Sequence, residues 1–300
     1  MKLNLSYIVV TKNKLPMLKW SLEFLIANRK QDEEIIVIDG LSDDGTPEYL
    51  KQLKSTNQIN KYISESDNNE SHAWNKGILL AEGELIKLIS DDDIFFYESI
   101  DICKKFMLEN FDSDVLIGGT YNVVYGDIQS IRYLESDFTN FIKYVNVKSP
   151  FACCGLSLML RRRNISKYGL FSTMSIAPDT DIMLRMTRLN TSIVFYNNPV
   201  CIRVENWASH FNVETSYHFY EEYIFLKYAL RTTTFSRHLW SYVQNKLKNM
   251  VRRQLLAFFP RKTQGIKIQT LYDPEFLNNI KEIVNSKVQS SNDNFFLKSN

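Results

Sequence analysis

The sequence predicts an α/β protein built on a mostly parallel sheet that is flanked by helices. Two observations indicate this fold class. Short apolar, β-branched runs alternate with stretches of helical spacing over residues 5–90. These runs are apolar along most of their length, which is typical of strands buried on both faces. With 300 residues and 44% hydrophobic side chains, the chain can also bury a large core.

The first part of the chain divides into four expected strands and three expected helices. The strands are residues 5–11, 34–39, 62–66 and 84–90. The helices are residues 16–26, 46–53 and 71–81, and Pro47 fits the first turn of the second helix because no helical partner awaits its missing N–H. In a parallel sheet of this kind, ligands bind beyond the carboxyl ends of the strands.

The pattern is looser in the rest of the chain. Further strands are expected at residues 114–118, 121–125, 156–161 and 193–196, with a helix at 179–189. From about Tyr217 the chain is expected to be mainly helical, and the polar tail from 285 to 300 is expected to fray. We therefore expect three parts, which are residues 1–95, residues 96–215 and a helical, basic C-terminal extension at 216–300.

The C-terminal extension carries a concentrated positive charge. Residues 223–272 contain ten Lys and Arg and no Asp or Glu, whereas the whole chain carries +2, so the remainder carries 2 − 10 = −8. A basic helix with Trp240 and Phe258 on its apolar face suits an anionic membrane surface, and a helix packed on the catalytic body is the equal alternative. No signal peptide and no spanning run are visible, so we expect a cytoplasmic protein, peripheral on the inner face of the cytoplasmic membrane.

Acidic residues follow three of the four expected parallel strands. Asp39 ends the second strand, Asp67 lies just after the third, and Asp91, Asp92 and Asp93 follow the fourth. Carboxylates gathered at one edge repel each other unless a cation or a hydroxyl-rich ligand compensates them. Their oxygens suit Mg²⁺ or Mn²⁺, and a diphosphate can complete the coordination shell. The pattern predicts a divalent metal site, with a solvated acidic turn as the alternative.

Several segments resemble the family 2 glycosyltransferases, which are inverting enzymes with the GT-A fold. They are the first strand with Thr11 at its end, VIDGLSDDGT at 37–46, SESD at 64–67, NKGI at 75–78, AEGE at 81–84 and SDD at 90–92. The resemblance covers residues 5–96 specifically, is thinner over 97–215, and is closest to bacterial O-antigen, capsule and colanic-acid glycosyltransferases. It implies transfer from a nucleotide sugar, first of all a UDP-sugar, to a saccharide acceptor, with Mn²⁺ or Mg²⁺ as cofactor.

The resemblance also implies roles for individual residues in a nucleotide-sugar-binding half, residues 1–95. Asp39 would hydrogen-bond the base and Asp92 would bind the metal, with Asp93 and His210 as further candidate ligands. The remaining expected donor-binding residues are Thr11, Asp67, Asn75, Lys76 and Asp91.

Inversion requires a base that deprotonates the acceptor hydroxyl on the face opposite the leaving nucleotide. The segment IAPDTDIMLR at 176–185, in the expected acceptor-binding half, resembles the family's acceptor-side acidic motif. The match makes Asp179 the expected base and Asp181 the alternative. Both acids also suit the start of a helix, where they would cap or stabilise it without any catalytic role.

Two other functions remain open from the sequence. A metal-dependent nucleotidyltransferase also uses acids at strand ends, but we expect it to carry a glycine-rich basic loop after the first strand, where Lys12-Asn13-Lys14 has no glycine. A non-catalytic nucleotide-sugar-binding module is the second alternative. The expected acceptor is a saccharide, plausible as a lipid-linked one, and no nucleic-acid partner is expected.

Overall fold

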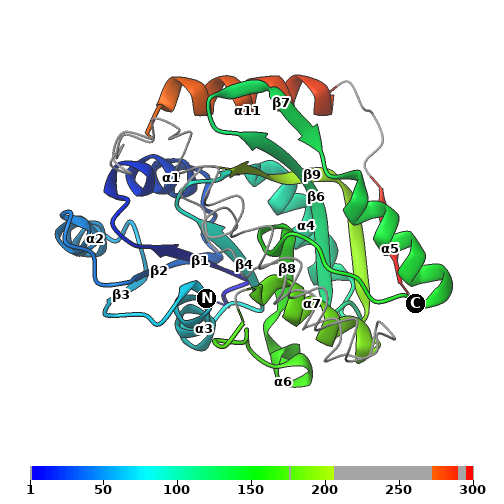
Figure 1. The fold of residues 1–300 in the computed structure, drawn as a ribbon. Coiled ribbons are helices and arrows are strands. Elements are labelled where there is room, and N and C mark those ends of the chain that lie inside the picture. The colour runs from blue at the N-terminus through cyan, green and yellow to red at the C-terminus, as the bar shows by residue number, and fades with distance from the viewer. Residues whose placement is uncertain (1, 176, 206–271, 290–294, 300) are drawn as a thin grey trace, which may run out of the picture.

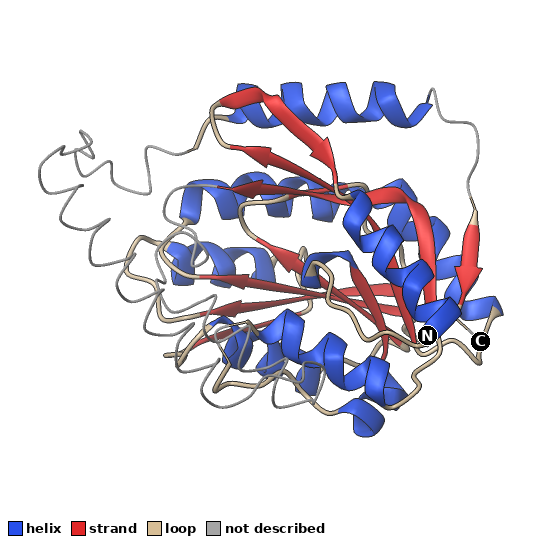
Figure 2. Ribbon diagram, turned by 45° about the vertical axis from the view of Figure 1, so that its right-hand side comes forward, coloured by secondary structure: helices blue, strands red, loops and turns tan. Residues whose placement is uncertain are grey.

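A single mixed sheet organises the chain. The computed structural model describes residues 2–175, 177–205, 272–289 and 295–299. Its strands lie in the order β10-β9-β6-β8-β4-β1-β2-β3, while β5 pairs with β9 and β7 pairs with β6. Helices cover both faces of this sheet (Figures 1 and 2). The α/β fold class expected from the sequence is therefore confirmed.

The parallel half of the sheet contains the four strands that the sequence predicts. They are β3 (Lys61–Ser64), β2 (Glu33–Asp39), β1 (Leu5–Thr11) and β4 (Leu85–Ser90). Neighbours in this order are parallel, and every residue of β1, β2 and β4 is buried. Burial on both faces explains why these strands are apolar runs and not alternating ones.

Two layers of helices sandwich the sheet. One face carries α1 (Leu15–Asn28), α2 (Thr46–Ser55) and α4 (Tyr97–Glu109), whose buried side chains belong to one cluster with Tyr7 and Val9 of β1. The other face carries α3 (Glu70–Leu80), α5 (Glu135–Val147) and α7 (Pro178–Arg188), whose buried side chains belong to one cluster with Ile8 and Val10, while the short α6 (Ile165–Tyr168) precedes α7. Gly77 lets α3 approach closely, since a Cβ there would lie 2.2 Å from Ile8.

The second half of the sheet departs from the expected strands. It contains β5 (Ile94–Phe95), β6 (Val115–Val124), β7 (Asp127–Tyr133), β8 (Leu158–Arg161) and β9 (Ile193–Glu205). The two strands expected at 114–118 and 121–125 are one strand, because Gly118 and Gly119 shift its register against β9 without ending it. The strand expected at 156–161 begins only at Leu158, because a 3₁₀ turn precedes it. β8 runs antiparallel between β4 and β6 and joins the two halves.

The chain returns to the sheet at its C-terminal end. Helix α11 (Pro274–Gln289) packs Leu277 and Ile280 against Ile202 of β9, and it crosses the top of Figure 1. Strand β10 (Phe296–Lys298) pairs antiparallel with β9. The prediction that the tail frays is wrong for these residues, because Phe296 stacks on Tyr196 with ring centroids 4.8 Å apart. The expected helical extension is confirmed for residues 274–289, while 206–271 lie outside the described residues.

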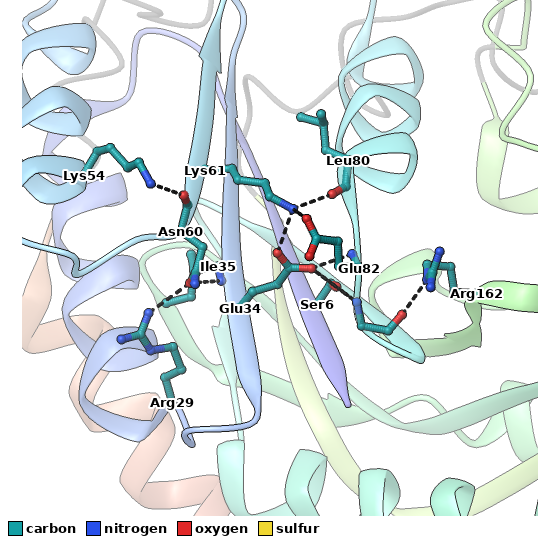
Figure 3. Close-up of polar contacts among 11 residues, drawn as sticks. Ser6, Arg29, Glu34, Ile35, Lys54, Asn60, Lys61, Leu80, Glu82 and Arg162 are labelled. Atoms are coloured by element: carbon teal, nitrogen blue, oxygen red, sulfur yellow. Dashed lines mark hydrogen bonds and ion pairs between the residues drawn. The ribbon is translucent and has the colours of Figure 1, made fainter. Parts of the chain in front are cut away.

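A buried carboxylate holds the amino ends of the parallel strands together (Figure 3). The Oε1 atom of Glu34 accepts hydrogen bonds of 2.6 Å from the Ser6 hydroxyl and from the backbone N–H of Glu82. The ammonium of Lys61 lies 3.2 Å from the other Glu34 oxygen. A buried charge that is paired and hydrogen-bonded in this way stabilises its surroundings. Glu34 thus has a structural role at the amino edge of the sheet, which is the edge opposite the aspartates.

Candidate active site

The four parallel strands end side by side and present polar residues at one edge. Thr11 of β1 is paired in register with Asp39 of β2, and Asp39 is paired in register with Ser64 of β3. On the other side of β1, Val10 is level with Ser90, the last residue of β4. This arrangement confirms that the acidic segments after β2, β3 and β4 meet at the carboxyl edge, where ligands bind in sheets of this type.

A lysine that the sequence analysis did not single out lies against two aspartates at this edge. The Nζ atom of Lys14 is 3.1 Å from Oδ1 of Asp91 and 2.6 Å from Oδ2 of Asp92. The Thr11 hydroxyl donates to the other Asp91 oxygen at 2.8 Å. Burial raises the pKa of Asp91 to about 6, although the charge of Lys14 opposes the shift. Burial alone would lower the pKa of Lys14, but the charges of Asp91 and Asp92 outweigh it and raise that pKa above its usual value.

Asp93 differs from its two neighbours. One of its oxygens accepts from the Ser90 hydroxyl at 2.5 Å, and the other accepts from the backbone N–H of Val204 at 2.7 Å. The residue is 6% exposed, and burial together with the charge of Asp92 raises its pKa well above the usual value. These hydrogen bonds connect the end of β4 to β9. Asp93 therefore has a structural role that the sequence did not suggest.

Asp39 organises the turn that follows β2. Its carboxylate accepts from the Ser42 hydroxyl at 2.5 Å and from the Ser64 hydroxyl at 2.6 Å, and its exposure is 0%. Ser42 in turn accepts a hydrogen bond of 2.7 Å from the backbone N–H of Asn13. Asp39 therefore links three loops at the carboxyl edge, and its contact with a nucleotide base stays a prediction.

The turn held by Asp39 forces Leu41 into a strained conformation. Leu41 has φ of 63°, in the left-handed region that favours glycine, and it is 59% exposed. We expect Leu41→Gly to stabilise the protein by about 0.5–1 kcal/mol, because relief of the left-handed strain exceeds the extra entropy that glycine loses on folding. Urea unfolding measures the change. Leu41→Ala retains the Cβ and should give no comparable gain, and a lower stability for Leu41→Gly would contradict this explanation.

Asp67 and Lys76 form an ion pair beside the same edge. The Nζ atom of Lys76 lies 2.6 Å from Oδ1 of Asp67 and 2.9 Å from the Glu65 carboxylate. The structure therefore brings together two of the expected donor-binding residues. Their contacts with a nucleoside and a phosphate stay predictions, and a phosphate would compete with Asp67 and Glu65 for the Lys76 ammonium.

Asn75 connects α3 to the loop before α7. Its Nδ2 donates to the carbonyl of Phe171 at 2.8 Å, and its Oδ1 accepts from the N–H of the same residue at 3.0 Å. This reciprocal pair positions the loop that leads to Asp179. A donor contact by Asn75 stays a prediction beside this structural role. His210, the remaining candidate ligand, lies outside the described residues.

The carboxylate of Asp179 lies in the first turn of α7. It accepts from the backbone N–H of Thr180 at 2.9 Å and packs on Gly155, where an added Cβ would be 3.0 Å from the Asp179 Cβ. Burial raises the pKa of Asp179, while hydrogen bonds from the N–H groups of Thr180 and Gly155 act in the opposite direction. A raised pKa makes a carboxylate a stronger base, which suits proton abstraction from a hydroxyl.

The neighbouring Asp181 is placed differently. It is 2% exposed, and the Nε of Arg185 donates to its Oδ2 at 3.0 Å. A second guanidinium nitrogen of Arg185 donates to the carbonyl of Leu170 at 2.6 Å. Asp181 thus fixes an arginine that holds the loop before α7. This geometry favours Asp179 over Asp181 as the base.

Glu70, in the first turn of α3, was not predicted as a site residue. It lies within reach of the charges of both Asp92 and Asp179. Crowding by surrounding atoms raises the pKa of Glu70 to about 7, the negative charge of Asp92 adds to the shift, and Asp179 contributes in the same direction. Its side chain nevertheless keeps access to solvent. Asp92 and Asp179 are thus both close enough to Glu70 for their charges to raise its pKa.

Asp137 of α5 is a further buried acid that the sequence did not reveal. It is 7% exposed, and its Oδ2 has no hydrogen-bond partner among the described residues. Burial raises the pKa of Asp137 to about 6, and the N–H of Cys154 and the charge of Arg203 act against this shift. Asp137 therefore favours the folded state at low pH, and that contribution is lost as the pH rises through about 6.

We expect Asp137→Asn, which cannot ionise, to raise the free energy of unfolding at pH 8 by about 1–3 kcal/mol and to change it little at pH 4. Urea unfolding at the two pH values measures the difference. Asp127→Asn makes the same chemical change at an exposed position and should have little effect at either pH. An equal effect of Asp137→Asn at both pH values would contradict the assigned shift.

The Asp91–Asp92 pair fits a divalent cation. Two carboxylates converge on one ammonium nitrogen, so this point already holds a positive charge. Among the described residues, no group of three or more His, Cys, Asp and Glu side chains could hold a metal. The protein would thus supply one or two carboxylates and the ligand's phosphates would supply further oxygens, which is the usual arrangement for Mg²⁺.

Comparison with protein families identifies the family of the chain. The family model described as glycosyl transferase family 2 matches residues 6–169, which is more than half of the chain. The chain belongs to glycosyl transferase family 2. The matched residues include β1 to β4 and the acidic segments after them, whereas Asp179 lies beyond the match.

Relatives of known sequence support this family membership. Glycosyltransferase GlyG of Streptococcus pneumoniae is 30% identical over 142 residues, which cover 47% of this chain and 43% of GlyG. An uncharacterized glycosyltransferase of Rickettsia felis is 24% identical over 190 residues, which cover 61% of this chain and 31% of that protein. The chain thus spans less than half the length of these relatives.

Solved structures share the fold. Mannosyltransferase PcManGT from Pyrobaculum calidifontis, in complex with GDP-Man and Mn²⁺, matches with a TM-score of 0.58 and 15% identity over 98% of this chain and 77% of that chain. S. aureus TarS 1–349, in complex with UDP-GlcNAc, matches with a TM-score of 0.54 and 14% identity over 95% of this chain and 82% of that chain. Together with the family membership, these likenesses confirm the GT-A fold.

Proposed function

We propose that this family 2 chain is an inverting glycosyltransferase that moves a sugar from a nucleotide-sugar donor to the hydroxyl of a saccharide acceptor. A UDP-sugar is the first donor to test, with GDP- and dTDP-sugars next. The single observation that carries the proposal is that the Asp91–Asp92 pair lies at the carboxyl edge of the parallel strands, while Asp92 and Asp179 are both close enough to Glu70 for their charges to raise its pKa.

The residues of the chain would divide the reaction between them. Asp91 and Asp92 would hold Mn²⁺ or Mg²⁺, which supplies positive charge to offset the charge that develops on the departing diphosphate. Thr11 orients Asp91 at this position. Asp179 would accept the proton of the acceptor hydroxyl as its oxygen attacks the anomeric carbon from the face opposite the nucleotide.

The acceptor and the cellular role belong to the same proposal. We assign the chain to the synthesis of a bacterial surface polysaccharide, with a lipid-linked saccharide as the acceptor. None of the helices in the described part of the chain is long and apolar enough to cross a membrane. Contact with anionic lipid would depend on the basic residues at 223–272, all of which lie outside the described ranges, so it stays a prediction.

A thermal-shift panel of nucleotide sugars with Mn²⁺ or with EDTA tests the proposal. A ligand at 100 times its dissociation constant adds about 2.7 kcal/mol to stability, which corresponds to a shift of several degrees. We expect sugars of one nucleotide to raise the melting temperature, and to do so more strongly with Mn²⁺. Sugar 1-phosphates without a nucleotide serve as the control.

Adding nucleoside triphosphates to the panel, and measuring product release alongside it, separates the alternatives. A nucleotidyltransferase would respond most strongly to nucleoside triphosphates and would release pyrophosphate. A non-catalytic module would be stabilised by a nucleotide sugar but would release no nucleoside diphosphate over hours. Either result would overturn the proposed transfer reaction while leaving the family membership intact.

A further inference from the structure

The ammonium of Lys14 occupies the point at which a divalent cation would bind. Its Nζ atom contacts one oxygen of Asp91 at 3.1 Å and one oxygen of Asp92 at 2.6 Å. The Lys14 side chain is 27% exposed, and those of Asp91 and Asp92 are 5% and 18% exposed. Because the contacts are partly shielded from water, the charges interact more strongly than an exposed ion pair would.

The backbone around Lys14 is fixed, so the side chain is the part that can move. The preceding residue, Asn13, donates its N–H to Ser42 at 2.7 Å and accepts from the N–H of Asp43 at 2.9 Å. The following residue, Leu15, donates its N–H to Asp44 at 2.8 Å. A lysine has a long flexible stem, and its ammonium can change partners while its Cα stays in place.

A divalent cation and the Lys14 ammonium compete for the same carboxylate oxygens. If the metal arrives alone, it must displace an ion-paired ammonium and then lie close to a positive charge. If the metal arrives with a diphosphate, the displaced ammonium finds new anionic oxygens within reach. Lys14 would then oppose the metal when no donor is bound and favour the metal together with the donor. Such coupling is reciprocal, so each ligand strengthens binding of the other.

We propose that Lys14 is the counter-ion of the Asp91–Asp92 pair in the donor-free protein and that its ammonium transfers to the donor diphosphate when a divalent cation takes its place. This inference rests on the proposed function for the identity of the diphosphate. Lys14 is thereby a binding residue that makes metal binding depend on the donor. It keeps the donor-free site from holding a metal tightly.

Calorimetry with two probes tests this role without any sugar substrate. The first probe is Mn²⁺ alone and the second is preformed manganese pyrophosphate, both titrated into metal-free protein. Lys14→Met removes the ammonium and retains a stem of similar length. Lys12→Met is the matched control, because it removes the same charge from the same loop at an exposed position. Lys14→Gln is a second neutral variant, and Lys14→Arg retains the charge.

We expect both neutral Lys14 variants to bind Mn²⁺ alone at least about tenfold more tightly than the unaltered protein, and manganese pyrophosphate about tenfold more weakly. Lys12→Met and Lys14→Arg should keep the original preference for manganese pyrophosphate. Equal affinity for Mn²⁺ alone with and without the Lys14 charge would overturn the inference, as would the same gain in Lys12→Met.

The result does not depend on the transfer reaction. If no nucleotide sugar stabilises the protein but the two probes rank as expected, the proposed function fails and the role of Lys14 stands. If a nucleotide sugar binds with Mn²⁺ but Lys14→Met leaves both affinities unchanged, the proposed function stands and the role of Lys14 fails.

Discussion

Asp179→Asn is expected to lower turnover by about 10²–10⁴-fold while changing donor affinity little, the range that general-base catalysis contributes. The amide has nearly the same shape as the carboxylate and can still accept from the N–H of Thr180, but it cannot take the acceptor proton. Release of nucleoside diphosphate measures turnover, and calorimetry with the donor measures affinity. The donor is the nucleotide sugar that the unaltered protein consumes fastest.

Asp181→Asn is the matched control for this substitution. It changes the same functional group two residues along α7, at a carboxylate that the structure assigns to Arg185. We expect Asp181→Asn to lower the melting temperature and to leave turnover at permissive temperature far higher than that of Asp179→Asn. The opposite ranking, with Asp181→Asn inactive and Asp179→Asn near the original rate, would move the base to Asp181.

Asp92→Asn is expected to reduce Mn²⁺-dependent donor binding and turnover by more than about 100-fold, beyond the loss that follows removal of an outer-shell partner of a metal site. The substitution removes one of the two negative charges that converge on the cation position and leaves Lys14 paired with Asp91. Donor titration with and without Mn²⁺ measures the effect.

Asp93→Asn tests whether position within the acidic triplet matters. The Asp93 oxygens accept from Ser90 and Val204, and its raised pKa favours a neutral side chain that an amide resembles. We expect this variant to keep the Mn²⁺ dependence of donor binding. If Asp93→Asn loses Mn²⁺ dependence and Asp92→Asn keeps it, the assignment of the pair is wrong.

The parallel half of the sheet could be predicted from the sequence because local signals specify it. Each of β1, β2 and β4 is mostly apolar, and every residue in them is buried. Parallel pairing then places the residues after Thr11, Asp39 and Ser90 at one edge, so the location of the acidic site follows from the strand ends alone.

The antiparallel half could not be predicted in the same way because its pairing is long-range. β8 contributes only four residues between β4 and β6, and the ten-residue β6 contains two glycines that sequence patterns associate with a strand end. β10 is a short strand in a polar tail, and stacking of Phe296 on Tyr196 attaches it to the sheet.

The side-chain contacts of individual site residues could not be predicted from the sequence either. The sequence does not show that Lys14 meets Asp91 and Asp92, because Lys14 lies 77 and 78 positions before them in the chain. The sequence also contains no sign that the Asn75 amide hydrogen-bonds the backbone of Phe171. Asp137 and Glu70 become notable only through the neighbours that shift their pKa.

The anomeric configuration of the released sugar tests the central claim most directly. Water can replace the acceptor, so proton NMR can follow hydrolysis of an α-linked nucleotide sugar in its first minutes, before the free sugar equilibrates between anomers. A base at Asp179 acting opposite the Asp91–Asp92 pair predicts that the β-anomer appears first, together with nucleoside diphosphate. Initial release of the α-anomer would mean retention and would contradict the single-displacement reaction proposed for this site.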